Sequence, residues 1–170
     1  MPAALSVTRR FLKLLKVLNW AYGGAIVALL IASFAYPEWF YRAIGATAAV
    51  GAARIGYGLQ AIAILGIVTI PINSAILDRL IAMVDTVRAG DPFVIENATR
   101  LKMIAWSVVA LEVIHVLILA IARALRSAGQ PLDIGDRFSL TPALAVLLLF
   151  VLAKVFEHGA RMREELEGTV

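Results

Sequence analysis

Four long apolar stretches divide the chain, and each is near the length that crosses a lipid bilayer. They occupy residues 17–36, 55–77, 103–122 and 138–153. A transmembrane helix needs about 20 consecutive apolar residues, and the first three stretches meet that length. The fourth meets it if the side chain of Lys154 extends back to the interface and Phe156 lies there. The pattern predicts an all-α integral membrane protein, a single domain of four transmembrane helices over residues 1–170.

Helical patterns continue beyond the second and fourth stretches. Apolar residues recur at helical spacing from 76 to 87 with charged residues between them, and Gly90 is a suitable C-terminal cap. Asp91 and Pro92 then suit the start of a new helix, followed by a short turn or helix around residues 93–97. Residues 154–170 form a similar extension, in which Glu157 and Arg161 have the spacing of an i,i+4 ion pair. We therefore expect a bundle that extends past the bilayer on the side of the turn at 78–102.

The distribution of Lys and Arg predicts the orientation of the spans. Eleven of these residues lie in the N-terminal segment, the turn at 78–102 and the C-terminal segment, and five lie on the other side. Because basic residues favour the cytoplasmic side, both termini are expected there, which requires an even number of spans. We expect a multi-pass protein of the bacterial inner membrane with N-in and C-in topology. The net charge of +4 is then explained by topology rather than by direct nucleic-acid binding.

The composition supports the membrane assignment and excludes thiol chemistry. The chain is 61% hydrophobic, with a mean hydropathy of +0.86 and no cysteine. Soluble domains are about 45–50% apolar, and a chain without cysteine forms neither disulfides nor zinc–thiolate sites. Arg9 and Arg10 resemble a twin-arginine signal, but the apolar run that follows is longer than the roughly 7–15 residues of a signal peptide. We expect the first span to be retained.

Glu112 and His115 are an ionisable pair inside an apolar stretch. Three residues apart, they share one face of the predicted third span. A carboxylate at the membrane centre costs roughly 2.5–3.5 kcal/mol on insertion scales, so it is usually buried against a partner. Glu112 is therefore protonated, or hydrogen-bonded to His115 or to another span, or it senses protons or a ligand. The polar candidates on the spans are Asn19, Gln60, Thr69, Asn73 and Ser107.

No arrangement of residues indicates catalysis or metal binding. Glu-x-x-His spacing occurs in di-iron helix bundles, but those need two such motifs and further glutamates, and this chain has two histidines in all. There is no P-loop, dinucleotide fingerprint or His-Glu-x-x-His motif. We expect no enzymatic activity, no metal and no cofactor. Pro71, with Asn73 beside the carbonyl it frees, predicts a kink in the second span that is either shape or hinge.

Two groups of residues resemble an uncharacterised bacterial family of four-span membrane proteins. One is Val87-Arg88-Ala89-Gly90-Asp91-Pro92-Phe93 with Glu96-Asn97-Ala98; the other is Phe156-Glu157-His158-Gly159-Ala160 with Arg163-Glu164-Glu165-Leu166-Glu167-Gly168-Thr169-Val170. The resemblance extends over roughly residues 77–170. The family is a domain of unknown function, and its members are often encoded beside a small Cro/C1-type helix-turn-helix regulator. That gene neighbourhood implies a soluble partner.

These observations predict a membrane-embedded sensor or regulator whose cytoplasmic face binds a soluble partner, which the resemblance suggests is a small helix-turn-helix regulator. Apolar Phe93, Ile95 and Leu166 would anchor the contact. The alternative is a homo-oligomeric transporter or channel with Glu112 and His115 lining its path, and a structural membrane subunit is a third possibility. The predicted partner-binding residues are Gly90, Asp91, Pro92, Phe93, Asn97, Arg100, Arg163 and Glu167.

Overall fold

Five helices make up the described part of the chain. The computed structural model describes residues 2–43, 52–127 and 139–167, without the side chains of residues 2–3, 52–54, 127 and 167. The helices are α1 (Pro2–Ala35), α2 (Pro37–Ala43), α3 (Ala52–Arg88), α4 (Ile95–Ser127) and α5 (Thr141–Glu167). All except α2 are long and apolar enough to cross a membrane. The prediction of an all-α protein with four spans is confirmed, although Phe138, the expected start of the fourth span, lies outside the described residues.

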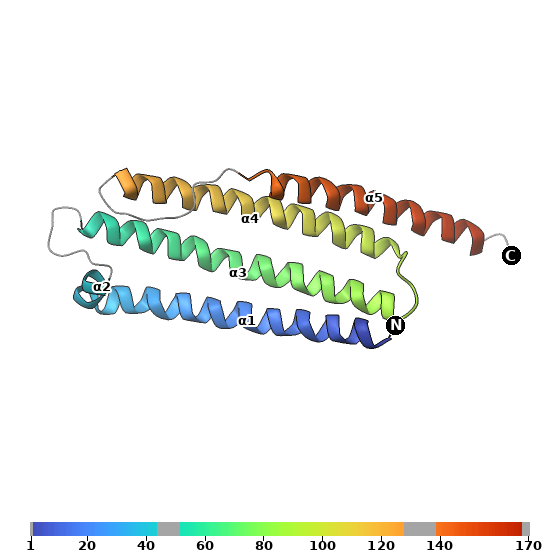
Figure 1. Cartoon of the computed structure of the whole chain (residues 1–170), viewed down its shortest axis with the longest axis horizontal. Helices are drawn as coiled ribbons and strands as arrows, with labels where there is room; N and C mark the ends of the chain where they lie inside the picture. Colours follow the sequence, from blue (N-terminus) through green and yellow to red (C-terminus); the bar gives the residue numbers. More distant parts are fainter. Residues whose placement is uncertain (1, 44–51, 128–138, 168–170) are drawn as a thin grey trace.

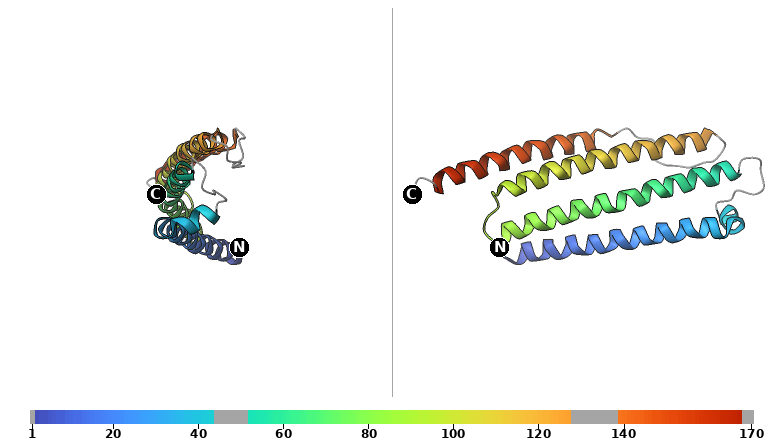
Figure 2. Two further views of the ribbon diagram at one scale, coloured as in Figure 1. Left: turned by 90° about the vertical axis from the view of Figure 1, so that its left-hand side faces the viewer. Right: turned by 180° about the vertical axis from the view of Figure 1, so that it is seen from behind.

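The four long helices lie side by side in one curved row. Helix α1 packs on α3, α3 on α4, and α4 on α5, as Figure 1 shows. Seen end-on in the left view of Figure 2, the row of helices is an arc. The expected bundle is therefore an open row rather than a closed four-helix arrangement. Lipid tails are as apolar as leucine, so apolar helices have no hydrophobic drive to close on one another in a bilayer.

The first and last described residues lie at the same end of the molecule (Figure 1). We call this end, comprising residues 2–16, 78–102 and 154–167, the terminal end. An even number of spans accounts for it, because each span takes the chain to the opposite end.

Helices α1 and α3 are joined by polar contacts along their whole length. The Asn19 amide donates to the Ile70 carbonyl oxygen at 2.9 Å, and Gln60 Nε2 donates to Ser33 Oγ at 3.1 Å. Between them Gly23 lies so close to Ile70 that an added Cβ would be 3.0 Å from its side chain. Small residues and interhelical hydrogen bonds are the usual means by which helices associate in lipid.

Helix α5 is displaced along α4 towards the terminal end. It starts beside the middle of α4 and projects beyond the other helices, as Figure 1 shows. Two alanines with 0% exposure, Ala105 on α4 and Ala153 on α5, accompany this packing. The rings of Trp106 and Phe150 meet edge-on with centroids 5.8 Å apart. The apolar part of α5, residues 141–153, is therefore roughly 20 Å long at about 1.5 Å per residue and is shorter than the ~30 Å hydrocarbon core.

A Schellman motif ends α3, as the sequence predicted for Gly90. The Gly90 amide donates to the Val87 carbonyl at 3.1 Å, and the Asp91 amide donates to the Thr86 carbonyl at 3.0 Å. Gly90 has a φ of +86°. The prediction that a helix starts at Asp91 and Pro92 is wrong, because α4 begins at Ile95. The Asp91 amide is held by α3, and the Pro92 carbonyl accepts from the Asn97 side chain at 2.8 Å instead of from a helical amide.

Replacement of Gly90 by alanine should destabilise the protein by about 1–2 kcal/mol, because a Cβ disfavours left-handed backbone. No atom lies within 4 Å of a Cβ added at Gly90, so the cost is conformational rather than steric. The control is Gly24→Ala, which also meets open space but lies inside α1 and should be neutral or stabilising by up to about 1 kcal/mol. Thermal unfolding in detergent measures both, and equal effects of the two substitutions would contradict the prediction.

Candidate functional site

Glu157 is the centre of an ion cluster between α4 and α5. Its carboxylate accepts from Lys102 Nζ at 3.0 Å, from Lys154 Nζ at 3.3 Å and from Arg161 Nη2 at 2.8 Å. The predicted i,i+4 pair of Glu157 and Arg161 is confirmed, and Lys102 adds a contact from another helix. Hydrogen bonds from Lys102 and Lys154 lower the pKa of Glu157 to about 2 from its ordinary value of 4.5.

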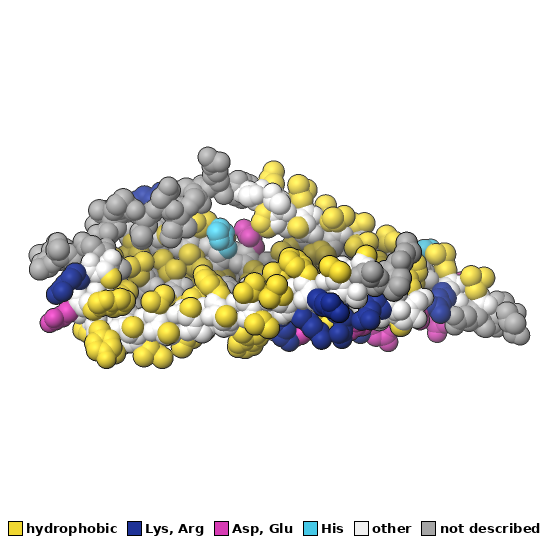
Figure 3. Space-filling view, turned by 60° about the horizontal axis from the view of Figure 1, so that its bottom comes forward, with side chains coloured by type: hydrophobic (Ala, Val, Ile, Leu, Met, Phe, Trp, Pro, Cys, Tyr) yellow, Lys and Arg dark blue, Asp and Glu magenta, His cyan; other side chains and the backbone are white. Residues whose placement is uncertain are grey.

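Two further ion pairs join α1 to α3 at the same end. Arg9 Nε lies 2.7 Å from Asp85 Oδ1, and Lys16 Nζ lies 2.6 Å from Asp78 Oδ1. The hydrogen bond from Arg9 lowers the pKa of Asp85. Figure 3 shows basic side chains gathered on this part of the molecule, beyond a band of hydrophobic side chains. We call the three sets of contacts, centred on Asp78, Asp85 and Glu157, the charged collar; it marks where the apolar parts of the helices end.

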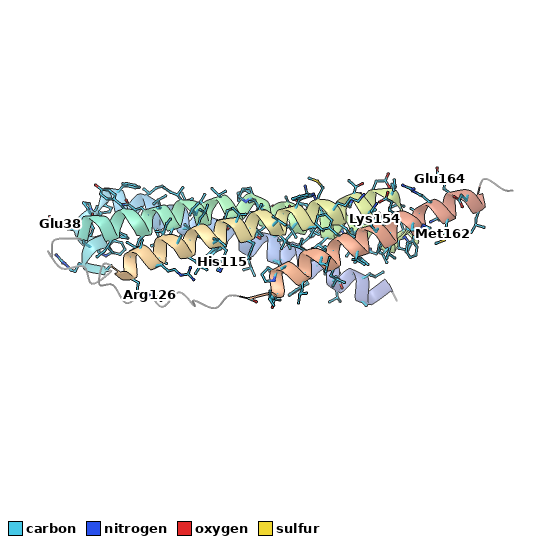
Figure 4. All side chains as sticks on the ribbon, turned by 90° about the horizontal axis from the view of Figure 1, so that it is seen from above. Glu38, His115, Arg126, Lys154, Met162 and Glu164 are labelled. Atoms are coloured by element: carbon cyan, nitrogen blue, oxygen red, sulfur yellow. The ribbon has the colours of Figure 1, made fainter. Side chains whose placement is uncertain are left out.

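An apolar groove crosses the collar along α5. It has a volume of about 860 Å³. Six apolar side chains line it, and they are Phe93, Phe150, Val151, Val155, Met162 and Leu166. The charged or titratable side chains in its lining are Lys154, His158 and Arg163. We call this feature the α5 groove; Figure 4 labels Lys154 and Met162 along the helix that carries it.

The half of the groove beyond the collar is open to solvent. Leu166 is 71% exposed and Met162 is 49% exposed, although both are large apolar residues. Between Lys154 and Leu166 the helix rises roughly 18 Å at about 1.5 Å per residue. If α5 is perpendicular to the bilayer plane, apolar side chains about 18 Å beyond Lys154 lie outside the region that lipid tails cover.

Phe93 connects the turn after α3 to this groove. Its ring lies against Gly159, where an added Cβ would be 2.9 Å from Phe93 Cδ1. It also meets the ring of Phe156 with centroids 5.4 Å apart. Asp91 accepts a hydrogen bond from Arg163 on α5. The turn and the outer part of α5 are thus joined by one aromatic contact and one ion pair.

The structure brings some of the predicted partner-binding residues to the groove and places the others elsewhere. Phe93 and Arg163 line the groove, and Asp91 is bonded to Arg163. Asn97 is instead 0% exposed, so its side chain is inside the turn rather than on its surface. The remaining members are Gly90 and Pro92 in the turn, Arg100, which donates to Asn97 Oδ1 at 2.7 Å, and Glu167, whose side chain lies outside the described residues.

Asn97 holds the turn together because its amide has two acceptors from two segments. Nδ2 donates to Thr86 Oγ1 at 2.7 Å and to the Pro92 carbonyl at 2.8 Å. Burial of an amide is tolerated when its donors and acceptor are all used. The side chain therefore fixes the position from which Phe93 reaches α5.

Val155, His158, Gly159 and Met162 were missed as site residues by the sequence reasoning. Their spacing of three and four residues places them along one face of α5, and this signal was available in the sequence. What was not available is that Phe93, more than 60 residues earlier in the chain, closes one side of the groove. Ile95, expected to be an anchor, is 49% exposed but does not line the groove.

Glu112 and His115 line a second feature, a cavity of about 480 Å³ midway along α4. Its other polar lining residues are Thr69 and Asn73 of α3 and Thr141 of α5. Pro142, in the first turn of α5, also lines it. We call it the Glu112 cavity; Figure 4 labels His115 on this part of α4, and Figure 3 shows the hollow between the helices. Across the described ranges, the structure shows no hydrogen bond between Glu112 and His115 and no group of three or more acidic, His or Cys residues placed to hold a metal.

Pro71 lies within the continuous helix α3. Its neighbour Ile70 accepts the Asn19 bond from α1, and Ser74 Oγ lies 3.3 Å from the indole nitrogen of Trp20, which donates to it. Asn73 lines the Glu112 cavity. Polar side chains therefore flank Pro71 on both sides of α3.

Comparison with known proteins gives one match. A family model described as "Protein of unknown function (DUF2975)" matches residues 28–170. No curated protein and no solved structure matches the chain.

Glu157→Gln should lower the melting temperature in detergent by a few degrees, because glutamine leaves three cations without their carboxylate. Because the pKa of Glu157 is lower in the folded state, its contribution to stability is fully present above the ordinary pKa of 4.5. That contribution is lost as the pH falls from 4.5 to about 2. The difference in melting temperature between wild type and the variant should therefore shrink over that pH range. Glu164→Gln, at an exposed position on the same helix, is the control and should have little effect. A difference independent of pH would contradict the assignment.

Proposed function

This chain belongs to the DUF2975 family of proteins of unknown function, and we propose that it is a membrane-embedded regulatory protein whose α5 groove binds a soluble protein in the cytoplasm. The observation that carries the proposal is the open apolar half of the groove beyond the charged collar. Contiguous exposed apolar surface outside a lipid environment marks an interaction site more often than an accident of composition. The protein acts by binding rather than by catalysis.

The groove fits an amphipathic helix better than an extended peptide. Its apolar members on α5 repeat at helical spacing, as in Val155, Met162 and Leu166, and they present a long shallow track rather than separate pockets. An amphipathic helix places its own apolar residues at the same spacing into such a track. Phe93 provides an aromatic wall, and aromatic residues are common anchors of protein interfaces.

The charge of the rim indicates the kind of helix. Among the described side chains that line the groove, Lys154, His158 and Arg163 are charged or titratable and none is acidic. Acidic residues flanking the partner's apolar stripe would therefore be favoured, chiefly through the rate and specificity of association. A small helix-turn-helix regulator of the kind that the sequence resemblance implies offers short helices of a suitable size. We propose such a regulator as the partner.

A cytoplasmic position of the terminal end is supported by its charge. Eleven of the sixteen Lys and Arg residues belong to the predicted cytoplasmic segments, and the terminal end gathers the collar. The first and last described residues lie at that end. We therefore propose N-in and C-in topology in the inner membrane of a bacterium, which brings the α5 groove within reach of a DNA-binding protein.

Topology is tested by fusing green fluorescent protein, and separately alkaline phosphatase, to each end of the full chain. We expect fluorescence and no phosphatase activity at both ends, because the first reporter matures in the cytoplasm and the second outside it. Fusions to a protein of known opposite topology are the control. Phosphatase activity at either end would refute the proposed orientation and remove the groove from the cytoplasm.

The docking proposal is tested by co-expressing the full chain with a small helix-turn-helix regulator of the kind that the sequence resemblance implies, and co-purifying the pair from membranes. Met162→Asp should weaken its retention about tenfold or more, because it places a charge on an apolar contact. Ile95→Asp is the matched control, since Ile95 has the same 49% exposure at the same end but lies outside the groove. Failure of the wild-type pair to co-purify, or equal loss in the two variants, would refute the proposal.

A further inference from the structure

Glu112 is surrounded by three adjoining cavities rather than by packed side chains. Besides the Glu112 cavity, one of about 570 Å³ and another of about 560 Å³ also include it in their lining. Pro142, in the first turn of α5, lines all three. The late start of α5 accounts for this space, since α5 begins at Thr141 beside the middle of α4 and does not pack on the other half of that helix.

The cavity of about 570 Å³ is apolar except at Glu112 and Ser139. Its walls are aliphatic side chains of α4 and α5, and they are Val109, Val113, Val116, Leu117, Ala143 and Val146. On α4, Val113 and Val116 are each 56% exposed, which opens this side of the cavity to the surroundings of the helices. In a bilayer those surroundings are lipid, so a ligand would enter from the membrane.

Among the described residues that line these cavities, Glu112 is the acidic one. Within the described ranges it makes no hydrogen bond or ion pair. Among the described residues, His115 and Arg123 of α4 are the other titratable or charged groups that line the cavities. Thr69 and Asn73 of α3, Thr141 of α5 and Ser139 just before it add uncharged polar groups.

We propose that this space is a binding site for a lipophilic organic cation that enters from the bilayer. The apolar walls take the hydrophobic body, and the Glu112 carboxylate pairs with the positive charge, which an intramembrane carboxylate requires. A neutral lipid would leave the carboxylate unpaired. A small metal cation prefers several oxygen ligands, and one carboxylate among aliphatic walls does not provide them. The site goes beyond the docking function and does not depend on the soluble partner.

The test is equilibrium dialysis of the full-length protein in detergent with radiolabelled tetraphenylphosphonium. We expect saturable binding that Glu112→Gln weakens at least about tenfold, because glutamine keeps the shape and removes the charge. Uncharged triphenylphosphine oxide should bind weakly and equally to wild type and variant.

Two controls separate the site from general uptake into the micelle and from misfolding. Glu164→Gln removes an exposed carboxylate on α5 and should leave binding unchanged. Val146→Phe fills the apolar wall without touching Glu112 and should weaken binding, whereas Leu147→Phe, one residue on at a 61% exposed position, should not. Equal binding by wild type and Glu112→Gln, or equal effects of the two phenylalanine variants, would overturn the proposal. Neither result bears on co-purification of the soluble partner.

Discussion

The register of α5 on α4 is the constraint on which the rest of the structure depends. The Lys102–Glu157 ion pair and the Trp106–Phe150 contact fix the same offset between the two helices, and Ala105 and Ala153 are both fully buried beside them in the sequence. With that offset, α5 starts beside Glu112 and ends well beyond the first residue of α4. The cavities at one end of α5 and the groove at its other end are therefore two consequences of one displacement.

Much of the local structure was predictable because it depends on short-range pattern. The number of spans follows from hydropathy, the Schellman cap from a single glycine, and the Glu157–Arg161 pair from helical spacing. The offset of α5 was not predictable, because it depends on contacts such as Lys102 with Glu157, which lie 55 residues apart. Hydropathy shows which residues along the chain are apolar, but it does not show how far one helix is shifted along the axis of its neighbour. The open row was missed for a related reason: apolar helix faces are equally satisfied by lipid or by protein.

The candidate site shows the same division between local and long-range information. Phe93 was expected at the surface and does line the groove, because an apolar residue in a polar turn usually has an external or long-range contact. Asn97 was expected at the surface and is buried. A polar residue next to a helix start suits either a solvent-facing or a capping role, and only the path of the turn brings Thr86 and the Pro92 carbonyl within reach of its amide. The polarity of a side chain therefore predicted the presence of hydrogen bonds but not their location.

Helix α5 is the one element that belongs to both the groove and the space around Glu112. It runs without interruption from Thr141 to Glu167, and α4 is the helix on which it chiefly packs. A helix transmits a displacement along its axis because its backbone hydrogen bonds do not permit one end to move independently. A ligand that altered the position of the Pro142 turn would thus alter Val155, Met162 and Leu166 relative to Phe93, which is held by the turn and Asn97. Linkage is reciprocal, so a partner bound in the groove would change ligand affinity at Glu112 by the same factor.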